Sequence, residues 1–300
     1  MYECRTTVFL ALGSPPAKGN LDMPSVMASR IFVVILLTLG FTMTFRFLST
    51  ERIAKEIFRV ETTDTVDPKI REIYRRQLDG RKALLAQHGP KSPFHDNLYN
   101  VAAPEVFCPG LVRMGHLSDG GKWVCNPQKI PNPCVIYSLG VNNEFSFDKE
   151  MFEIARCQIR AFDKDRMQPP TVEFYNSIGA TLAAAKITKA TNVSAAEYSF
   201  RDVVRMHNHS KIDILKIDIE GGEYDVVKQM ATTPICQILV ELHGTPFRML
   251  SVLRTLSSHG FYLFHHEING GSLKACEFSL IHESCLRDYG IDVIYGRYLS

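Results

Sequence analysis

The stretch KIDILKIDIEGGEYDVV, Lys211 to Val227, decides the fold of this 300-residue chain. From Leu215 onward apolar residues alternate with Lys216, Asp218 and Glu220, and a pair of glycines follows. This period of two predicts a buried strand that ends in carboxylates, and the residues after the glycines predict a helix. Ligands of open α/β sheets bind outside the carboxyl ends of the strands, so both acids are expected at a binding edge. The alternative is that they only end the strand and cap the helix.

Strands and helices alternate from Pro133 to the carboxyl terminus, which predicts a doubly wound, mainly parallel α/β sheet. The expected strands are 134–140, 157–163, 171–179, 211–220, 237–244, 261–268 and 273–283. The expected helices are 145–155, 195–208, one beginning near 223, and 247–259. Only DKDRMQPP separates the second and third strands, which is too short for the usual connecting helix.

The ends of three expected strands indicate a nucleoside-containing ligand. Gly140 follows the first strand, Asp163 ends the second, and Asp218 ends the fourth. Glycine lets backbone approach a ligand closely, and an acid at the next strand end can accept both ribose hydroxyls. The loop after Gly140 lacks the G-x-G-x-x-G pattern that binds a pyrophosphate, so S-adenosylmethionine fits better than a dinucleotide. Alone, Asp163 would be read as a solvated strand-end acid.

Composition sets limits on size and partners. With 300 residues, of which 45% are hydrophobic, the chain is large enough for one α/β domain with extensions. The net charge of +2 and the absence of a long basic run give no electrostatic case for nucleic acid, so no nucleic-acid partner is expected.

The amino-terminal region differs from the rest of the chain. Residues 31–45 carry no charge, and the segment 31–48 is expected to be a transmembrane signal anchor or a signal peptide. As a helix it would rise roughly 27 Å, slightly less than a hydrocarbon core of about 30 Å. A buried core helix is the alternative. We expect a leader at 1–30, a charged stalk at 49–106 and a folded domain at 107–300.

The side of the membrane is a separate question. Basic residues after the apolar segment mildly favour a cytoplasmic domain. Two N-glycosylation sequons, at Asn192 and Asn208, and seven cysteines from Cys108 onward favour an oxidising lumen, with at least one cysteine unpaired. We expect a single-pass membrane protein with a lumenal domain, or a secreted protein if the segment is cleaved.

The run IDILKIDIEGGEYDVV, with AFDKD before it and ELHG after it, resembles FkbM-type S-adenosylmethionine-dependent methyltransferases. The segments RMGHLSDGGKWVC and PCVIYSLGVNNEFSFD are more similar to the methyltransferase-like protein 24 group. The resemblance extends from about Phe107 to the end of the chain. It implies a class I, Rossmann-like fold with seven strands and an antiparallel last strand. It also implies that Gly140 and Asp163 bind the cofactor and that Asp218 and Glu220 face the methionine end and substrate.

An enzyme of this kind would transfer a methyl group to oxygen of a hydroxylated small molecule or glycan. The protein would position the acceptor in line and remove its proton. The expected catalytic residues are Asp218, Glu220, Glu241 and His243, with His243 as the first choice of base. The same four could instead hold a divalent cation, but no metal is our expectation.

Two other classes of protein are alternatives. A membrane-anchored scaffold could retain the fold and have no turnover. A lumenal glycosyltransferase would share the anchor and stalk, but the segment from Asp213 to Asp218 does not supply its metal-binding D-x-D.

Overall fold

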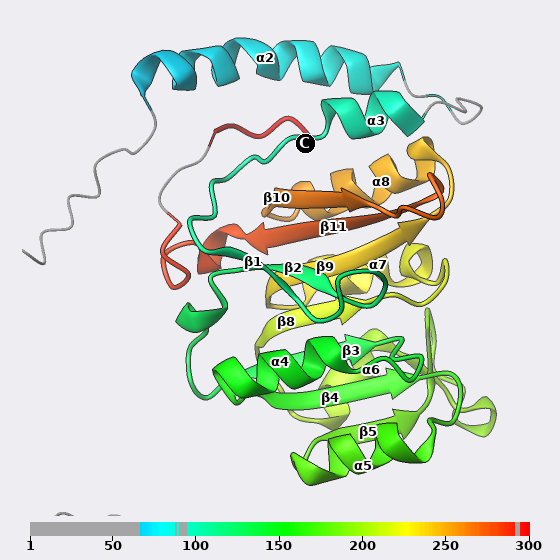
Figure 1. The fold of residues 1–300 in the computed structure, drawn as a ribbon. Helices are drawn as coiled ribbons and strands as arrows, with labels where there is room; N and C mark the ends of the chain where they lie inside the picture. Colours follow the sequence, from blue (N-terminus) through cyan, green and yellow to red (C-terminus); the bar gives the residue numbers. More distant parts are fainter. Residues whose placement is uncertain (1–66, 88, 90–94, 292–294) are drawn as a thin grey trace, which may run out of the picture. The chain divides into compact units, whose positions relative to one another are not determined.

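A seven-stranded mixed sheet forms the centre of the computed structural model, which describes residues 67–87, 89, 95–291 and 295–300 (Figure 1). Its strand order is β10-β11-β9-β8-β3-β4-β5. The strands are β3 Val135–Leu139, β4 Gln158–Asp163, β5 Thr181–Ala184, β8 Ile212–Ile217, β9 Ile235–His243, β10 Phe261–Ile268 and β11 Ala275–His282. Within this described sheet β11 alone is antiparallel to its neighbours on both sides. The expected seven-stranded, Rossmann-like sheet with an antiparallel last strand is confirmed.

Strand β8 lies at the middle of the sheet, where helices cover both faces. All six of its residues are buried, including Asp213 and Lys216. Asp213 accepts a hydrogen bond from the amide of Val135 at 2.9 Å, which joins β8 to the start of β3. The strand ends at Ile217, so the expected alternation does not extend to Glu220, which lies in a turn with φ of 57°.

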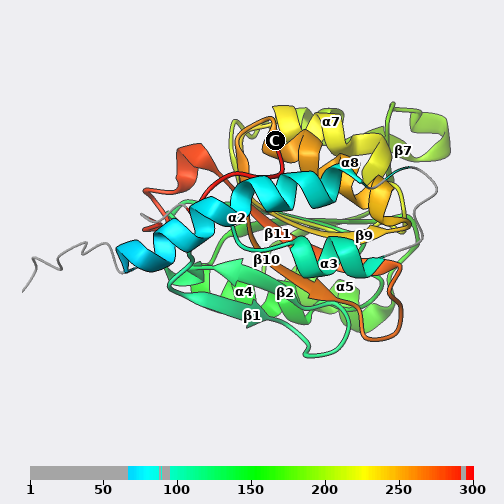
Figure 2. The ribbon, with the colours of Figure 1, turned by 90° about the horizontal axis from the view of Figure 1, so that it is seen from above.

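The helices form two outer layers (Figure 2). Helices α6 Phe200–Met206, α7 Glu223–Thr232 and α8 Pro246–Ser257 cover one face. The other face is covered by α4 Ser146–Ala155, α5 Pro169–Ser177 and an antiparallel hairpin of β1 Leu111–Met114 and β2 Lys122–Cys125. A short parallel pair, β6 Lys186–Thr188 and β7 Glu197–Ser199, lies outside the main sheet.

The prediction of a third strand at 171–179 is wrong, because most of this segment forms helix α5. The helix starts on a pair of prolines, which suit its first turn, and buries Thr171 and Tyr175, which are one turn apart. The third strand is β5, just downstream. The connection between β4 and β5 therefore contains the helix that a doubly wound fold requires.

The region expected to be a stalk, 49–106, is folded onto the domain in the part that the structure describes. Helices α2 Pro68–Ala86 and α3 His95–Val101 contribute Leu85 and Leu98, each at most 1% exposed, to the main core. The ring of Tyr74 stacks on Tyr295 near the carboxyl terminus, with ring centroids 4.4 Å apart. The described part of the domain therefore begins ahead of the expected boundary at Phe107.

The amino-terminal expectations lie outside the described residues. The leader at 1–30 and the membrane segment at 31–48 both fall within residues 1–66. Among the helices that the structure does describe, none is both long and apolar enough to cross a membrane.

Six cysteines form three disulfides in the described domain. The pairs are Cys108–Cys125, Cys134–Cys157 and Cys236–Cys285. Cys276 is free and buried on β11. The expectation that at least one of the seven downstream cysteines is unpaired is confirmed.

Candidate active site

The register of four parallel strands brings their carboxyl ends to one edge of the sheet. Leu139 of β3 lies opposite Phe162 of β4 on one side and Ile217 of β8 on the other, while Ile217 also lies opposite Val240 of β9. The next residue on each strand is therefore at the same level. These residues are Gly140, Asp163, Asp218 and Glu241.

A cavity of about 500 Å³ lies along this edge, within the usual size range of small-molecule sites. All six residues singled out from the sequence line it: Gly140, Asp163, Asp218, Glu220, Glu241 and His243. The lining also includes Ala185 and the residues of β6, together with Asp119 and Asn269. The structure thus brings the six together, whereas their chemical roles stay predictions.

Gly140 is required by the close approach of two backbones. Its φ is 81°, and a Cβ atom built on it would lie 1.7 Å from the carbonyl oxygen of Asp218. Its amide donates to the carbonyl of Phe162 at 2.9 Å. The turn after β3 therefore fits closely against the end of β8, and Gly140 lines the cavity at this point.

Asp163 links the loop after β3 to the end of β4. The residue is buried, with only 7% of its surface exposed. The carboxylate accepts hydrogen bonds from the amides of Asn142 at 2.8 Å and Asp165 at 2.9 Å, one on each oxygen. Each oxygen keeps a further lone pair, so the group can still accept from a ligand hydroxyl. Asp163 thus both shapes the loop and lines the cavity.

The turn after β8 aims its polar groups into the cavity. The buried carboxylate of Glu223, in the first turn of α7, accepts from the amide of Ile219 at 2.7 Å. Burial raises the pKa of this carboxyl group. The side chain of Glu220 is 74% exposed, and its carboxylate lies 3.7 Å from Nε2 of His243. Glu220 is therefore at the mouth of the cavity.

His243 lies at the end of β9 between two carboxylates. Its Nε2 is 3.7 Å from Glu220 and 3.7 Å from Glu241. Its buried Nδ1 has no hydrogen-bond partner among the described residues. An imidazole that lies close to acids at the cavity wall is suitable as a proton acceptor.

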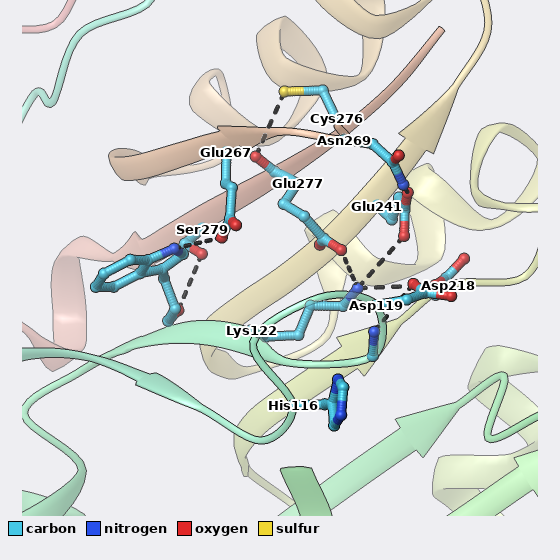
Figure 3. Close-up of polar contacts among 12 residues, drawn as sticks. His116, Asp119, Lys122, Asp218, Glu241, Glu267, Asn269, Cys276, Glu277 and Ser279 are labelled. Atoms are coloured by element: carbon cyan, nitrogen blue, oxygen red, sulfur yellow. Dashed lines mark hydrogen bonds and ion pairs between the residues drawn. The ribbon is translucent and has the colours of Figure 1, made fainter. Parts of the chain in front are cut away.

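A buried lysine of the hairpin, Lys122, was not found from the sequence (Figure 3). Its Nζ forms an ion pair with Glu277 of β11 and lies 3.5 Å from Glu241 and 3.7 Å from Asp218. Glu277 lies directly opposite Glu241 in the strand register. Lys122 and these three acids are called the Lys122 cluster below.

The Lys122 cluster shifts the pKa values of its carboxyl groups in opposite directions. Burial raises the pKa of Asp218, and the nearby Glu241 charge adds to this, although the Lys122 ammonium opposes it. Burial likewise raises the pKa of Glu277 to about 8. Burial would also raise the pKa of Glu241, but the Lys122 ammonium and hydrogen bonds from Asp218, Glu277 and Asn269 hold it below its ordinary value. Glu241 is therefore the carboxyl group of the cluster that most favours ionisation.

Three cavity residues also satisfy the distances of a metal site. Ligand atoms of Asp218, Glu241 and His243 all lie within 4.8 Å of one another. Two carboxylates and an imidazole are ligands that divalent cations accept.

A family model described as a methyltransferase domain matches residues 61–282. The match covers most of the chain, and the chain belongs to this methyltransferase family. The family agrees with the sequence-based expectation of a methyltransferase that uses S-adenosylmethionine. The comparison with curated proteins gave no match.

Solved structures similar to the chain include several methyltransferase-fold proteins. The fibrillarin pre-rRNA processing protein of Methanococcus jannaschii has 11% identity and a TM-score of 0.38, over 58% of this chain and 89% of its own. Aeropyrum pernix fibrillarin with natively bound S-adenosyl-L-methionine has 11% identity and a TM-score of 0.36, over 58% and 84%. The N-terminal domain of EvdMO1 with SAH bound has 12% identity and a TM-score of 0.35, over 69% and 96%. Similarity at this level carries no information about the substrate.

Proposed function

We propose that this protein is an S-adenosylmethionine-dependent methyltransferase that methylates a hydroxyl group of a small molecule or glycan. The observation that carries the proposal is the single cavity that joins Gly140 and Asp163 at one end to Asp218, Glu241 and His243 at the other. Membership of the methyltransferase family supports the reaction type. The sequence resemblance to FkbM-type enzymes and the methyltransferase-like protein 24 group supports that narrower assignment.

The two ends of the cavity suit the two substrates. The buried carboxylate of Asp163, beside the close turn at Gly140, fits a nucleoside because it can accept hydrogen bonds from ribose hydroxyls. At the other end the carboxylates and the amide of Asn269 can hydrogen-bond to a hydroxylated acceptor. We call these the nucleoside end and the acceptor end.

The chemistry assigned to the protein is positioning and proton removal. The cofactor supplies a methyl group bonded to a positively charged sulfur. As the new oxygen–carbon bond forms, the carbon–sulfur bond breaks, and the hydroxyl proton moves to a base of the acceptor end. His243 is our choice, with the ionised Glu241 beside it stabilising the imidazolium.

Loss of the Asp163 carboxylate is expected to weaken binding of S-adenosylmethionine by about 100-fold, which is about 2.7 kcal/mol. Asp163→Ala removes both a ribose acceptor and the anchor of Asn142. Isothermal titration of S-adenosylmethionine and of its demethylated product into the full chain measures the effect. Asp79→Ala, an exposed acid on α2, is the control and should bind as the wild type does.

Equal binding by wild type and Asp163→Ala would overturn the assignment of the nucleoside end. No binding by the folded wild type would reject the methyltransferase proposal and favour the anchored scaffold. The titration needs the whole domain, because a fragment starting near Val101 would lack Leu85 and Leu98 of the core.

We also propose that residues 31–48 anchor the protein in a membrane, with the domain in the lumen of the secretory pathway, or that their cleavage releases it. The three disulfides support an oxidising compartment. The side chains of Asn192 and Asn208, the two sequon residues, are exposed.

Lumenal placement predicts that the full chain carries N-glycans when it is expressed in eukaryotic cells. Treatment with an N-glycosidase should then increase its mobility on a denaturing gel. The double variant Asn192→Gln, Asn208→Gln should show no such change. An untreated wild type that already runs like the double variant would contradict lumenal placement.

A further inference from the structure

Lys122 places a positive charge among the acids of the acceptor end. The lysine residue is 1% exposed, and its Nζ contacts all three carboxylates of the Lys122 cluster. Asp218 and Glu241 are among the groups that line the cavity. A lysine ammonium removed from water is stable only when paired in this way. Its partners are therefore fixed by the ammonium as much as the ammonium is fixed by them.

The hairpin that carries Lys122 is held rigidly over the sheet. The disulfide Cys108–Cys125 closes its base, and Gln237 of β9 bonds to both the amide and the carbonyl of Cys125, at 2.9 and 2.8 Å. The hydroxyl of Ser279 on β11 donates to the carbonyl of Trp123 at 2.9 Å. The hydrogen bonds at Trp123 and Cys125 directly follow Lys122 on β2, so the fold fixes the backbone that carries its side chain.

The turn of the hairpin is held as firmly as its base. The amide of Gly115 donates to Glu150 at 2.6 Å, and that of His116 donates to Ser146 at 2.7 Å, both on α4. Asp119 of the same turn lines the cavity. The hairpin thus connects the α4 layer to the acceptor end.

The ammonium of Lys122 and a divalent cation would use the same two acids. Asp218 and Glu241 are within ligand distance of one another and of His243, which is the arrangement that could hold a metal. Both acids already lie within 3.7 Å of Nζ. A metal bound there would be repelled by the buried ammonium at close range.

We propose that Lys122 is a positioning residue that acts as a covalently attached cation at the acceptor end, in the place where a divalent metal ion would otherwise bind. It orients the carboxylates of Asp218 and Glu241 beside the cavity, and the site does not bind a metal while the lysine is present. The term acceptor end rests on the proposed methyltransferase function, whereas the role of Lys122 as a cation does not.

The test is a titration of the full chain with Mn²⁺, in which electron paramagnetic resonance measures the concentration of the free ion. The wild type should show no stoichiometric binding, whereas Lys122→Met should bind one Mn²⁺ at least about 100-fold more tightly than the wild type. Adding Glu241→Gln to Lys122→Met should abolish the new site. Lys211→Met, which removes a partly exposed lysine paired with Asp213, is the control and should gain no site.

Thermal unfolding supplies a second measurement. If Lys122 had only a structural role, its replacement would not make the melting temperature depend on Mn²⁺. Mn²⁺ should raise the melting temperature of Lys122→Met and leave that of the wild type unchanged, because a ligand of the folded state alone stabilises it. A folded Lys122→Met that gains no Mn²⁺ site would overturn the proposal. Binding of Mn²⁺ by the wild type that is lost in Glu241→Gln would also overturn it. The comparison of the wild type with Glu241→Gln does not require Lys122→Met to fold.

The two proposals fail in different experiments. Binding of S-adenosylmethionine to the same preparations in the presence of a chelator is measured separately. If S-adenosylmethionine does not bind, the methyltransferase function is rejected and the assignment of Lys122 is unaffected.

Discussion

Replacing Lys122 with methionine is expected to lower the free energy of unfolding by about 3–5 kcal/mol at pH 8, because it leaves buried carboxylates without their counter-charge. The lysine is 1% exposed and contacts three acids, so solvent cannot compensate for its loss. The control Lys211→Met removes a lysine whose side chain is 41% exposed, and should change the stability by at most about 1 kcal/mol. Urea unfolding of both variants and the wild type measures the difference.

The effect of Lys122→Met should be smaller at pH 5 than at pH 8. The pKa of Glu277 is about 8 in the folded protein and 4.5 ordinarily, so the folded state holds this proton more tightly. Stability from Glu277 is therefore present below pH 4.5 and is lost as the pH rises towards 8. Removing the ammonium raises this pKa further, so the variant loses more stability over that range than the wild type. A difference that does not depend on pH would contradict the pairing.

Replacing Gly140 with alanine is expected to destabilise the domain by about 2–5 kcal/mol, from the left-handed backbone and from overpacking together. The added Cβ would lie 1.7 Å from the carbonyl oxygen of Asp218, so the ends of β3 and β8 must separate. Because both ends line the cavity, the folded variant should also lose measurable binding of S-adenosylmethionine. Urea unfolding and isothermal titration measure the two effects.

Gly179→Ala provides a matched control for Gly140→Ala. Gly179 has φ of 66°, also in the left-handed region, but a Cβ atom built there meets nothing within 4 Å. It should therefore lose only about 1–2 kcal/mol from backbone strain and retain cofactor binding. Equal losses in the two variants would show that the close approach at Gly140 has no energetic consequence.

Much of the sheet could be predicted from the sequence because the signals are local. Strands β4, β8 and β9 follow short apolar or alternating runs, and their polar ends identify the edge where Asp163, Asp218 and Glu241 meet. The error at α5 has a local cause as well. Thr171, Val172, Phe174 and Tyr175 favour strands by type, but the proline pair and the burial of residues one turn apart fit a helix.

The Lys122 cluster could not be predicted in the same way. Lys122 and Glu277 are 155 positions apart in the sequence, and no local pattern relates a lysine in a short hairpin to an acid in the last strand. The nearest signal was the unusual sequence around it, where a lysine stands beside the only tryptophan of the chain. Its burial depends on the packing of the hairpin across β9 and β11, which is a property of the tertiary structure.

The pairing of Lys122 with Glu277 also affects the order in which the site forms during synthesis. The hairpin leaves the ribosome before any strand of the main sheet, whereas its strongest partner lies on β11, the last strand. A nascent chain that has not yet produced β11 therefore holds an ammonium with an incomplete set of counter-charges at the future acceptor end. The acceptor end is completed only after β11 has been synthesised, and a chain that stops before Ala275 cannot assemble it.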